Sequence, residues 1–220
     1  MRRIVVLTSN SGTGSNLQAL IDAQSTEYNG QVVGVVSSTP DAYALVRAHE
    51  ADIPSEVLSF KEYQAAGKPR GIYEEDLARV VQKFTPDLVV LAGWMLILGK
   101  PFLQYFPWKV LNLHPGLIPD KKGEPVELPD GTVADDFAGL AGENAIKALL
   151  ASGQTYAGST VHVVTEEVDW GPVVKRGLVK VEPEDTVESL YDRLKKKEHE
   201  IMVGSLRELC WNPQRVNRRA

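Results

Sequence analysis

Residues Val110–Pro119 read VLNLHPGLIP, an apolar run in which Asn112 and His114 stand two positions apart. On a β-strand, alternation points these two side chains to the same face of the sheet. Pro115 has no backbone N–H to continue a ladder of hydrogen bonds, which places His114 at the carboxyl end of the strand. Ligands bind at this edge of open α/β sheets. An amide and an imidazole there could polarise a carbonyl group and exchange a proton, although both could also be ordinary polar residues at a strand end.

Strands and helices alternate on the amino-terminal side of this stretch. We expect strands at Ile4–Thr8, Gln31–Val36, Val57–Leu58 and Leu88–Ala92, with helical spacing at Leu17–Ile21, Ala42–Glu50 and Tyr73–Lys83. On the other side we expect a surface loop at Asp120–Asp136, a helix at Asn144–Leu150, strands at Thr160–Thr165 and Val173–Val181, a helix at Thr186–Leu209 and a loose tail at Trp211–Ala220. This order predicts a doubly wound, mostly parallel α/β sheet, Rossmann-like, with a C-terminal antiparallel extension and a long final helix.

The composition excludes several classes of protein. The chain has 220 residues, 43% of them hydrophobic, and a net charge of −5, which gives no reason to expect a nucleic-acid partner. No apolar run approaches the roughly 20 residues of a membrane span, and the first apolar run predicts a core strand rather than a secretory signal. With Cys210 as its only cysteine, the chain is expected to be a single cytoplasmic domain.

A glycine-rich turn follows the first strand and opens the first helix. Residues Gly12–Asn16 read GTGSN, and backbone N–H groups in such a turn can point at an anion, with the helix dipole adding to the attraction. We interpret the turn as a phosphate site, the alternative being a turn that needs glycine only for tight geometry. Leu17 stands where a dinucleotide fingerprint has its third glycine, and no Gly-Lys-Ser/Thr follows for a Walker loop.

Two charged stretches carry weaker indications. Residues 166–172 read EEVDWGP, an acidic turn whose carboxylate would favour the charged imidazolium if it lay beside His114. The run at Lys195–His199 is typical of a solvated helix face, and His49 and His199 are expected on the surface. His162 lies inside an apolar strand, where we expect a hydrogen-bonded structural role. No His, Cys or Asp grouping has the spacing of a zinc site.

Taken together, four stretches resemble the phosphoribosylglycinamide formyltransferases, a folate-dependent formyltransferase family. They are Ser11–Ala19, Leu91–Met95, Leu111–Pro115 and Val168–Pro172, in the family's order, and the likeness extends from Ile4 to about Leu209. The resemblance implies transfer of a formyl group from 10-formyltetrahydrofolate, as co-substrate, to the amine of glycinamide ribonucleotide in purine biosynthesis. It implies small-molecule partners only, no metal, and a monomer or homodimer.

The resemblance also assigns roles to residues of this chain. It divides the domain into a nucleotide- and phosphate-binding half (1–115), a folate and catalytic half (116–209) and a tail (210–220). Ribonucleotide contacts are implied for Gly14, Ser15, Asn16, Lys195 and Glu198. Co-substrate contacts are implied for Arg70, Met95, Leu96, Ile97, Leu98, Asn112 and Val168.

The implied mechanism is direct attack of the amine on the formyl carbon. Asn112 and a protonated His114 would stabilise the oxyanion, and Asp169 would keep His114 charged and oriented. The sequence departs from the family at Leu96, where some relatives carry Arg, at Trp170, and at the inserted Asp120–Asp136. The stretch Ala138–Asn144 lacks the histidines often found there. The alternatives are a formyltransferase acting on a sugar amine or another amine, and a non-catalytic nucleotide-binding module.

Overall fold

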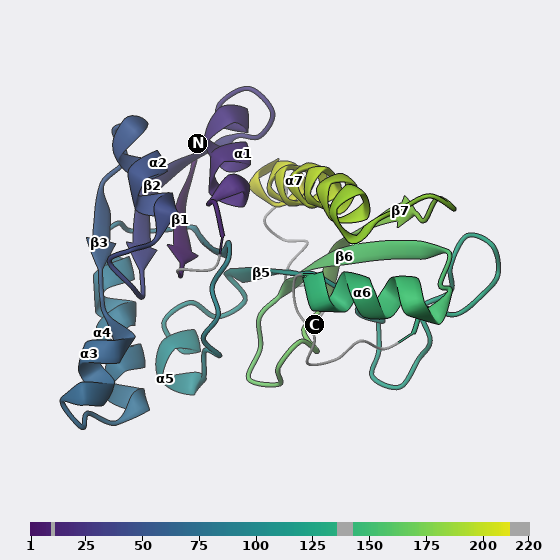
Figure 1. Cartoon of the computed structure of the whole chain (residues 1–220). Helices are drawn as coiled ribbons and strands as arrows, with labels where there is room; N and C mark the ends of the chain where they lie inside the picture. Colours follow the sequence, from purple (N-terminus) through teal and green to yellow (C-terminus); the bar gives the residue numbers. More distant parts are fainter. Residues whose placement is uncertain (10–11, 136–142, 212–220) are drawn as a thin grey trace.

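The computed structural model describes residues 1–9, 12–135 and 143–211, which form an α/β structure around one seven-stranded sheet (Figure 1). Its strands are β1 (Arg2–Thr8), β2 (Gly30–Ser37), β3 (Ser55–Val57), β4 (Leu88–Leu91), β5 (Val110–His114), β6 (Tyr156–Val163) and β7 (Val173–Lys180), in the order β3-β2-β1-β4-β5-β6-β7. The first five strands are parallel, whereas β6 and β7 each run antiparallel to the strand before. The expected fold is therefore confirmed.

Helices cover both faces of the sheet. They are α1 (Ser15–Ala23), α2 (Tyr43–Glu50), α3 (Phe60–Ala65), α4 (Arg70–Gln82), α5 (Lys100–Leu103), α6 (Glu143–Ser152) and α7 (Val187–Trp211). One layer holds α1, α2 and α7, and the opposite layer holds α4 and α5, with α3 packed against α4 (Figure 1). The helix α6 packs with α7 against β6 and β7.

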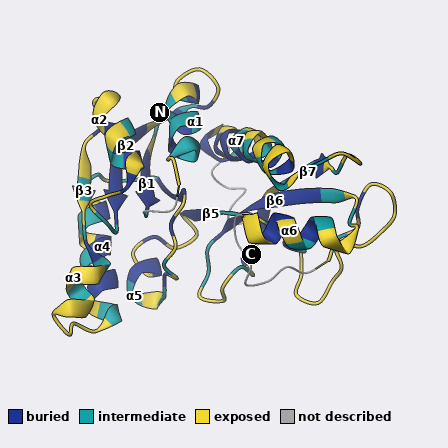
Figure 2. Cartoon of the chain, in the orientation of Figure 1, coloured by how far each residue is buried: buried dark blue, intermediate teal, exposed yellow. Residues whose placement is uncertain are grey.

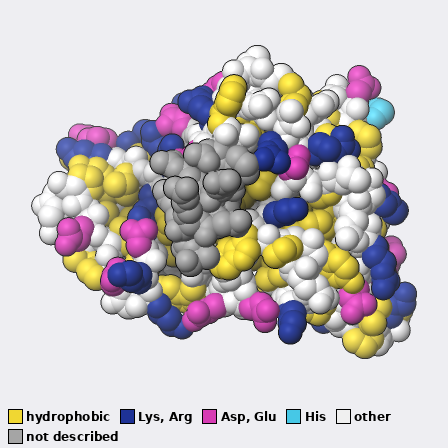
Figure 3. Space-filling view, turned by 180° about the vertical axis from the view of Figure 1, so that it is seen from behind, with side chains coloured by type: hydrophobic (Ala, Val, Ile, Leu, Met, Phe, Trp, Pro, Cys, Tyr) yellow, Lys and Arg dark blue, Asp and Glu magenta, His cyan; other side chains and the backbone are white. Residues whose placement is uncertain are grey.

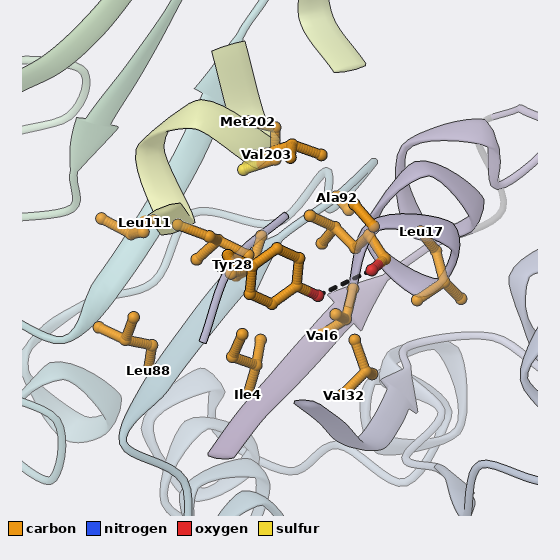
Figure 4. Close-up of a cluster of buried hydrophobic side chains, with 14 of the residues drawn as sticks. Ile4, Val6, Leu17, Tyr28, Val32, Leu88, Ala92, Leu111, Met202 and Val203 are labelled. Atoms are coloured by element: carbon orange, nitrogen blue, oxygen red, sulfur yellow. Dashed lines mark hydrogen bonds between the residues drawn. The ribbon is translucent and has the colours of Figure 1, made fainter. Parts of the chain in front are cut away.

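The central strand β1 shows how the sequence produces these two layers. Ile4 and Val6 face α1 and α7, and the alternating residues Val5 and Leu7 face α4 and α5. All four side chains are fully buried, as expected for a parallel strand covered on both faces (Figure 2). Within the first layer the hydroxyl of Tyr28 donates a hydrogen bond of 2.7 Å to the carbonyl of Leu20, so the one polar atom of that ring is satisfied (Figure 4).

The structure differs from the sequence-based expectation in several elements, among them β3, which spans Ser55–Val57 rather than Val57–Leu58. The short helices α3 and α5 were not expected, because one or two turns give too little hydrophobic periodicity to detect. Strand β6 begins at Tyr156 rather than Thr160, because the residues before Thr160, including Gly158 and Ser159, also pair with β7. Helix α4 begins at Arg70, three residues before the expected start.

The surface of the described part carries both signs of charge. On the face shown in Figure 3, basic and acidic side chains are interspersed rather than gathered into one basic stripe. None of the helices within the described ranges is long and apolar enough to cross a membrane. Three sequence-based expectations lie wholly or partly outside the described residues, namely the end of the Asp120–Asp136 loop, most of Ala138–Asn144 and the tail after Trp211. The described part of the loop, up to Asp135, is mostly exposed.

Candidate active site

Two loops leave the sheet at the point where its strand order reverses. Strands β1 and β4 are parallel neighbours, and the chain turns to opposite layers after each of them. Ser9 connects the two exits, because its backbone N–H donates to the carbonyl of Gly93 at 3.1 Å and its Oγ accepts from the N–H of Met95 at 3.3 Å. Open α/β sheets bind ligands in the crevice at such a switch point. The glycine-rich turn and the 93–98 loop lie at this switch point.

The glycine-rich turn requires glycine at position 14. Gly14 has a φ of 67° at the N-cap of α1, and a Cβ there would lie 3.0 Å from the Cα of Ala44 in α2. Arg47, also in α2, donates from Nε to the carbonyl of Thr13 at 2.7 Å. The amide oxygen of Asn16 is buried without a hydrogen-bond partner in the described part of the chain. An unsatisfied buried acceptor is suited to a ligand group that donates a hydrogen bond, such as a hydroxyl, while the helix N-terminus beside it favours an anion.

Strands β5 and β6 pair so that Asn112 and His162 stand directly opposite each other. The Nδ1–H of His162 donates to the carbonyl of Val163 at 3.0 Å, which leaves Nε2 facing the site. Nε2 lies 3.2 Å from Nδ2 of Asn112 and 3.4 Å from Oδ1 of Asp169. The neutral ring accepts from the amide, and the protonated ring donates to the carboxylate.

Asp169 lies between two histidines. Its second carboxylate oxygen, Oδ2, is 3.5 Å from Nδ1 of His114. The turn that carries Asp169 is tight: the residue has a φ of 59°, a left-handed conformation that Asp and Asn adopt more readily than most. A Cβ at Gly171 would lie 1.7 Å from the carbonyl oxygen of Val163, so only glycine allows the turn to close against β6. The acidic turn therefore places its carboxylate at the end of β5.

The pKa of the Asp169 carboxyl is lowered from its ordinary value of 3.8. The main cause is the hydrogen bond from His162, and partial burial, which alone would raise the pKa, opposes it. The positive charges of His114 and His162 lower the pKa further. Asp169 is consequently an anion over the physiological pH range, and its negative charge favours a protonated imidazole beside it.

The segment after β5 passes close to His114. A Cβ at Gly116 would lie 2.9 Å from Nε2 of His114, so a side chain at position 116 would crowd the imidazole. Thr160, opposite His114 on β6, donates from Oγ1 to the carbonyl of Gly116 at 2.8 Å and accepts from the N–H of Ile118 at 3.0 Å. These bonds fix the course of the chain past the imidazole.

Apart from Asn112 on β5, the residues predicted to contact the co-substrate lie on three segments. In the loop after β4, Met95 and Ile97 are more than 60% exposed, Leu96 is half-buried and Leu98 is buried. Arg70 begins α4 and donates to the carbonyl of Ile97, which ties it to the same loop. On the acidic turn, Val168 and Trp170 are 46% and 39% exposed. Exposed apolar side chains beside polar groups are typical of small-molecule sites.

Lys195 and Glu198 do not join the group around His114. Nζ of Lys195 lies 2.7 Å from Oε2 of Glu198, whose other oxygen accepts from the hydroxyl of Ser159 at 3.1 Å. Ser159 points to the opposite face of β6 from His162. Glu198 is buried, so the expectation of a solvated charged face is wrong at that position. The cause is the packing of α7 onto β6, which a charge run does not reveal.

Two histidines differ from the expectation in an informative way. His162 is hydrogen-bonded within its strand, as expected, but it also contacts Asn112 and Asp169. Sequence reasoning missed this second role because the cross-strand partner of His162 is 50 residues away. His199 was expected on the surface, yet its Nε2 is buried, and burial lowers its pKa below 6.5. Among the described residues no His, Cys, Asp and Glu side chains are grouped as a metal site.

Comparison with known proteins places these features in one family. Residues 2–206 match the model of the formyl transferase family. The phosphoribosylglycinamide formyltransferase of Saccharomyces cerevisiae is 40% identical over 217 residues, covering 92% of this chain and 94% of the yeast protein. The crystal structure of glycinamide ribonucleotide transformylase 1 from Symbiobacterium toebii matches with a TM-score of 0.78 and 35% identity, covering 96% of this chain and 88% of that chain.

Other relatives are much longer. The human trifunctional purine biosynthetic protein adenosine-3 is 38% identical over 205 residues, which are 93% of this chain. The chain spans only 18% of the length of that protein. It therefore corresponds to one part of the trifunctional relatives and to nearly the whole of the yeast enzyme.

The lowered pKa of Asp169 predicts how this residue contributes to acid stability. A carboxyl whose pKa is lower in the folded than in the unfolded protein stabilises the fold above pH 3.8, and this contribution is lost as pH falls through the folded pKa. We expect the difference in unfolding free energy between wild type and Asp169→Asn to shrink as pH falls from 6 toward about 2.5, measured by urea denaturation at each pH.

A control variant tests whether this trend is specific. Gly71→Ala in α4 changes no titratable group and places its Cβ 3.7 Å from the nearest side chain, so its stability difference should stay constant with pH. A constant difference for Asp169→Asn as well would contradict the assigned pKa shift.

Proposed function

Because the chain belongs to the formyl transferase family, within the group of phosphoribosylglycinamide formyltransferases, we propose that it transfers the formyl group of 10-formyltetrahydrofolate to the amine of glycinamide ribonucleotide. The observation that carries the proposal is the convergence of Asn112, His114 and Asp169 at the carboxyl end of β5. A module that only bound a nucleotide through the glycine-rich turn would have no use for this group. The proposal therefore requires both a binding turn and a reacting centre.

The two substrates are assigned to opposite sides of the reacting centre. Gly14, Ser15 and Asn16 would hold the phosphate of the ribonucleotide at the start of α1, where the helix dipole favours an anion. The exposed apolar groups of Met95, Ile97 and Val168 would flank the pterin ring. Arg70 would face the carboxylates of the folate's glutamate, and Lys195 and Glu198 would approach the phosphate and ribose. The proposed contacts to each substrate come from residues both before and after position 115, because one sheet connects the two halves.

The chemistry begins with attack of the neutral amine on the formyl carbon. As the new C–N bond forms, negative charge develops on the formyl oxygen. Nδ2 of Asn112 has two protons, and when one is directed to His162 the other is available to this oxyanion. Nε2 of His114, beside Gly116, is the second donor, since Nδ1 faces Asp169. Each such donor typically contributes about 3–4 kcal/mol to transition-state stabilisation.

The second half of the reaction moves one proton and breaks one bond. The attacking amine must lose a proton, and the folate nitrogen that leaves the formyl carbon must gain one. Asp169 keeps His114 charged while the oxyanion exists and positions a water that carries the proton between the two nitrogens. The products are formylated ribonucleotide and tetrahydrofolate, so the atoms balance without a metal or a covalent enzyme intermediate.

The most direct test is a formyl-transfer assay on the purified protein. We expect turnover with glycinamide ribonucleotide and 10-formyltetrahydrofolate, because the chain has both a phosphate turn and the reacting group. A panel of sugar amines with the same co-substrate serves as the comparison. Turnover of a sugar amine without turnover of the ribonucleotide would replace the proposed substrate while leaving the reaction type in place. Absence of transfer to every amine would overturn the proposal.

Substitutions in the reacting group should affect turnover far more than binding. His114→Ala removes an oxyanion donor and should lower kcat about 10²–10³-fold. Asp169→Asn should also lower kcat by orders of magnitude, because it removes the negative charge beside His114 while Asn tolerates the same left-handed backbone. Ribonucleotide affinity, measured by calorimetry, should largely survive in both. His49→Ala, at an exposed histidine of α2, is the control, and near-normal turnover in either site variant would contradict the mechanism.

The phosphate turn can be tested by two variants of one residue. Asn16→Ala removes the side-chain amide, whose NH2 group can donate to a phosphate, and should raise KM for the ribonucleotide about tenfold, with little change in KM for the folate. Asn16→Asp has nearly the same shape but adds a negative charge, so it should weaken ribonucleotide binding further through repulsion of the phosphate. A purely structural role would give the opposite order, since the isosteric variant would then be the milder one.

A further inference from the structure

Glu74 is a buried carboxylate that the mechanism above does not use. It lies in the second turn of α4 and is only 4% exposed. Both of its oxygens accept hydrogen bonds: Oε1 from Nε of Arg70 at 2.9 Å, and Oε2 from the backbone N–H of Gly99 at 2.9 Å. A Cβ at Gly99 would lie 3.2 Å from Oε2, so the backbone approaches the carboxylate closely.

These bonds connect α4 to the loop after β4 from two sides. Arg70 begins the helix, and its guanidinium lies 4.5 Å from the centre of the Phe60 ring and donates to the carbonyl of Ile97. Gly99 ends the same loop as the N-cap of α5. Glu74 thus holds the loop directly at Gly99 and indirectly, through Arg70, at Ile97.

Stability alone gives a weak reason for a charge at this position. Burying a carboxylate is unfavourable even when a partly exposed guanidinium pairs with it, and an apolar replacement of similar volume is often neutral or stabilising. The carboxylate of Glu74 instead fixes the positions of two hydrogen-bond donors, because each of its oxygens accepts from one of them. Arg70 donates its hydrogen bonds to described residues from Nε and Nη2, and none from Nη1. Glu74 therefore fixes Arg70 while leaving the Nη1 group as a donor for a ligand.

We propose that Glu74 is a positioning residue for the formyl-folate co-substrate, which acts by holding both Arg70 and the loop that carries Met95 and Ile97. This inference rests on the proposed function, since it takes the loop and Arg70 to be the folate-binding surface. It assigns no contact between Glu74 and the substrate. Loss of the carboxylate should therefore change how well the folate binds, and leave the reacting group around His114 as it is.

The test is Glu74→Gln, with Glu75→Gln as the matched control on the same helix. A carboxamide has one acceptor oxygen, so one of the two N–H donors would face another N–H group. We expect KM for 10-formyltetrahydrofolate to rise about tenfold, with kcat and KM for the ribonucleotide changed less than about twofold. Glu75, whose carboxylate is 3.6 Å from Nη2 of Arg79 on the helix surface, should give wild-type values when changed. Equal changes in both KM values, or none, would overturn the proposal.

A double-mutant cycle tests whether Glu74 acts through Arg70. If it does, the effect of Glu74→Gln on folate KM should be clearly smaller in an Arg70→Gln background than in the wild type. Full additivity would overturn that part of the proposal. Circular dichroism verifies folding, and if Glu74→Gln does not fold, Glu74→Asp replaces it with the same expectations. A wild-type protein without formyl transfer would refute the proposed function instead, before any variant is compared.

Discussion

The register between β5 and β6 is the constraint on which the reacting group depends. This antiparallel pairing sets Asn112 opposite His162 and His114 opposite Thr160. A slip of one residue would turn these side chains to the face under α7 and bring leucine and valine to the site. The register is fixed because the alternate residues of both strands, such as Leu111 and Val161, are buried in the layer beneath α7. The burial of apolar side chains on one face of the β5–β6 pair therefore fixes the positions of the polar side chains on the other face.

The geometry of the reacting group also depends on one charged side chain and on two glycines. One carboxylate, Asp169, lies between two imidazoles at 3.4 and 3.5 Å, so a single anion orients both rings. Two glycines permit the close approaches: Gly171 lets the acidic turn close against β6, and Gly116 lets the chain pass beside Nε2 of His114. Neither glycine takes part in the proposed reaction. Each permits an approach between atoms that any side chain would prevent.

The parts of this structure that depend on local pattern could be predicted from the sequence, and the parts that depend on distant pairing could not. The strand Val110–His114 has its predicted bounds because an apolar run followed by proline is a local signal. The nearness of Asp169 to His114 came only from the family resemblance, since 55 positions separate them and no periodicity connects them. The second contact of His162 and the burial of Glu198 were missed for the same reason: both depend on which segments pack together.

The helix α7 connects parts of the structure that lie far from one another along the sheet. Its 25 residues span about 37 Å, from the packing against α6, β6 and β7 to the packing against α1. Gly177 of β7 allows close contact, because a Cβ there would lie 2.6 Å from Lys197 and 2.8 Å from Ile201. The C-terminal half of α1 therefore lies against a helix that also packs on β7, the edge strand of the sheet. A side chain added at Gly177 would displace α7, and the displaced helix would disturb the packing of α1 as well.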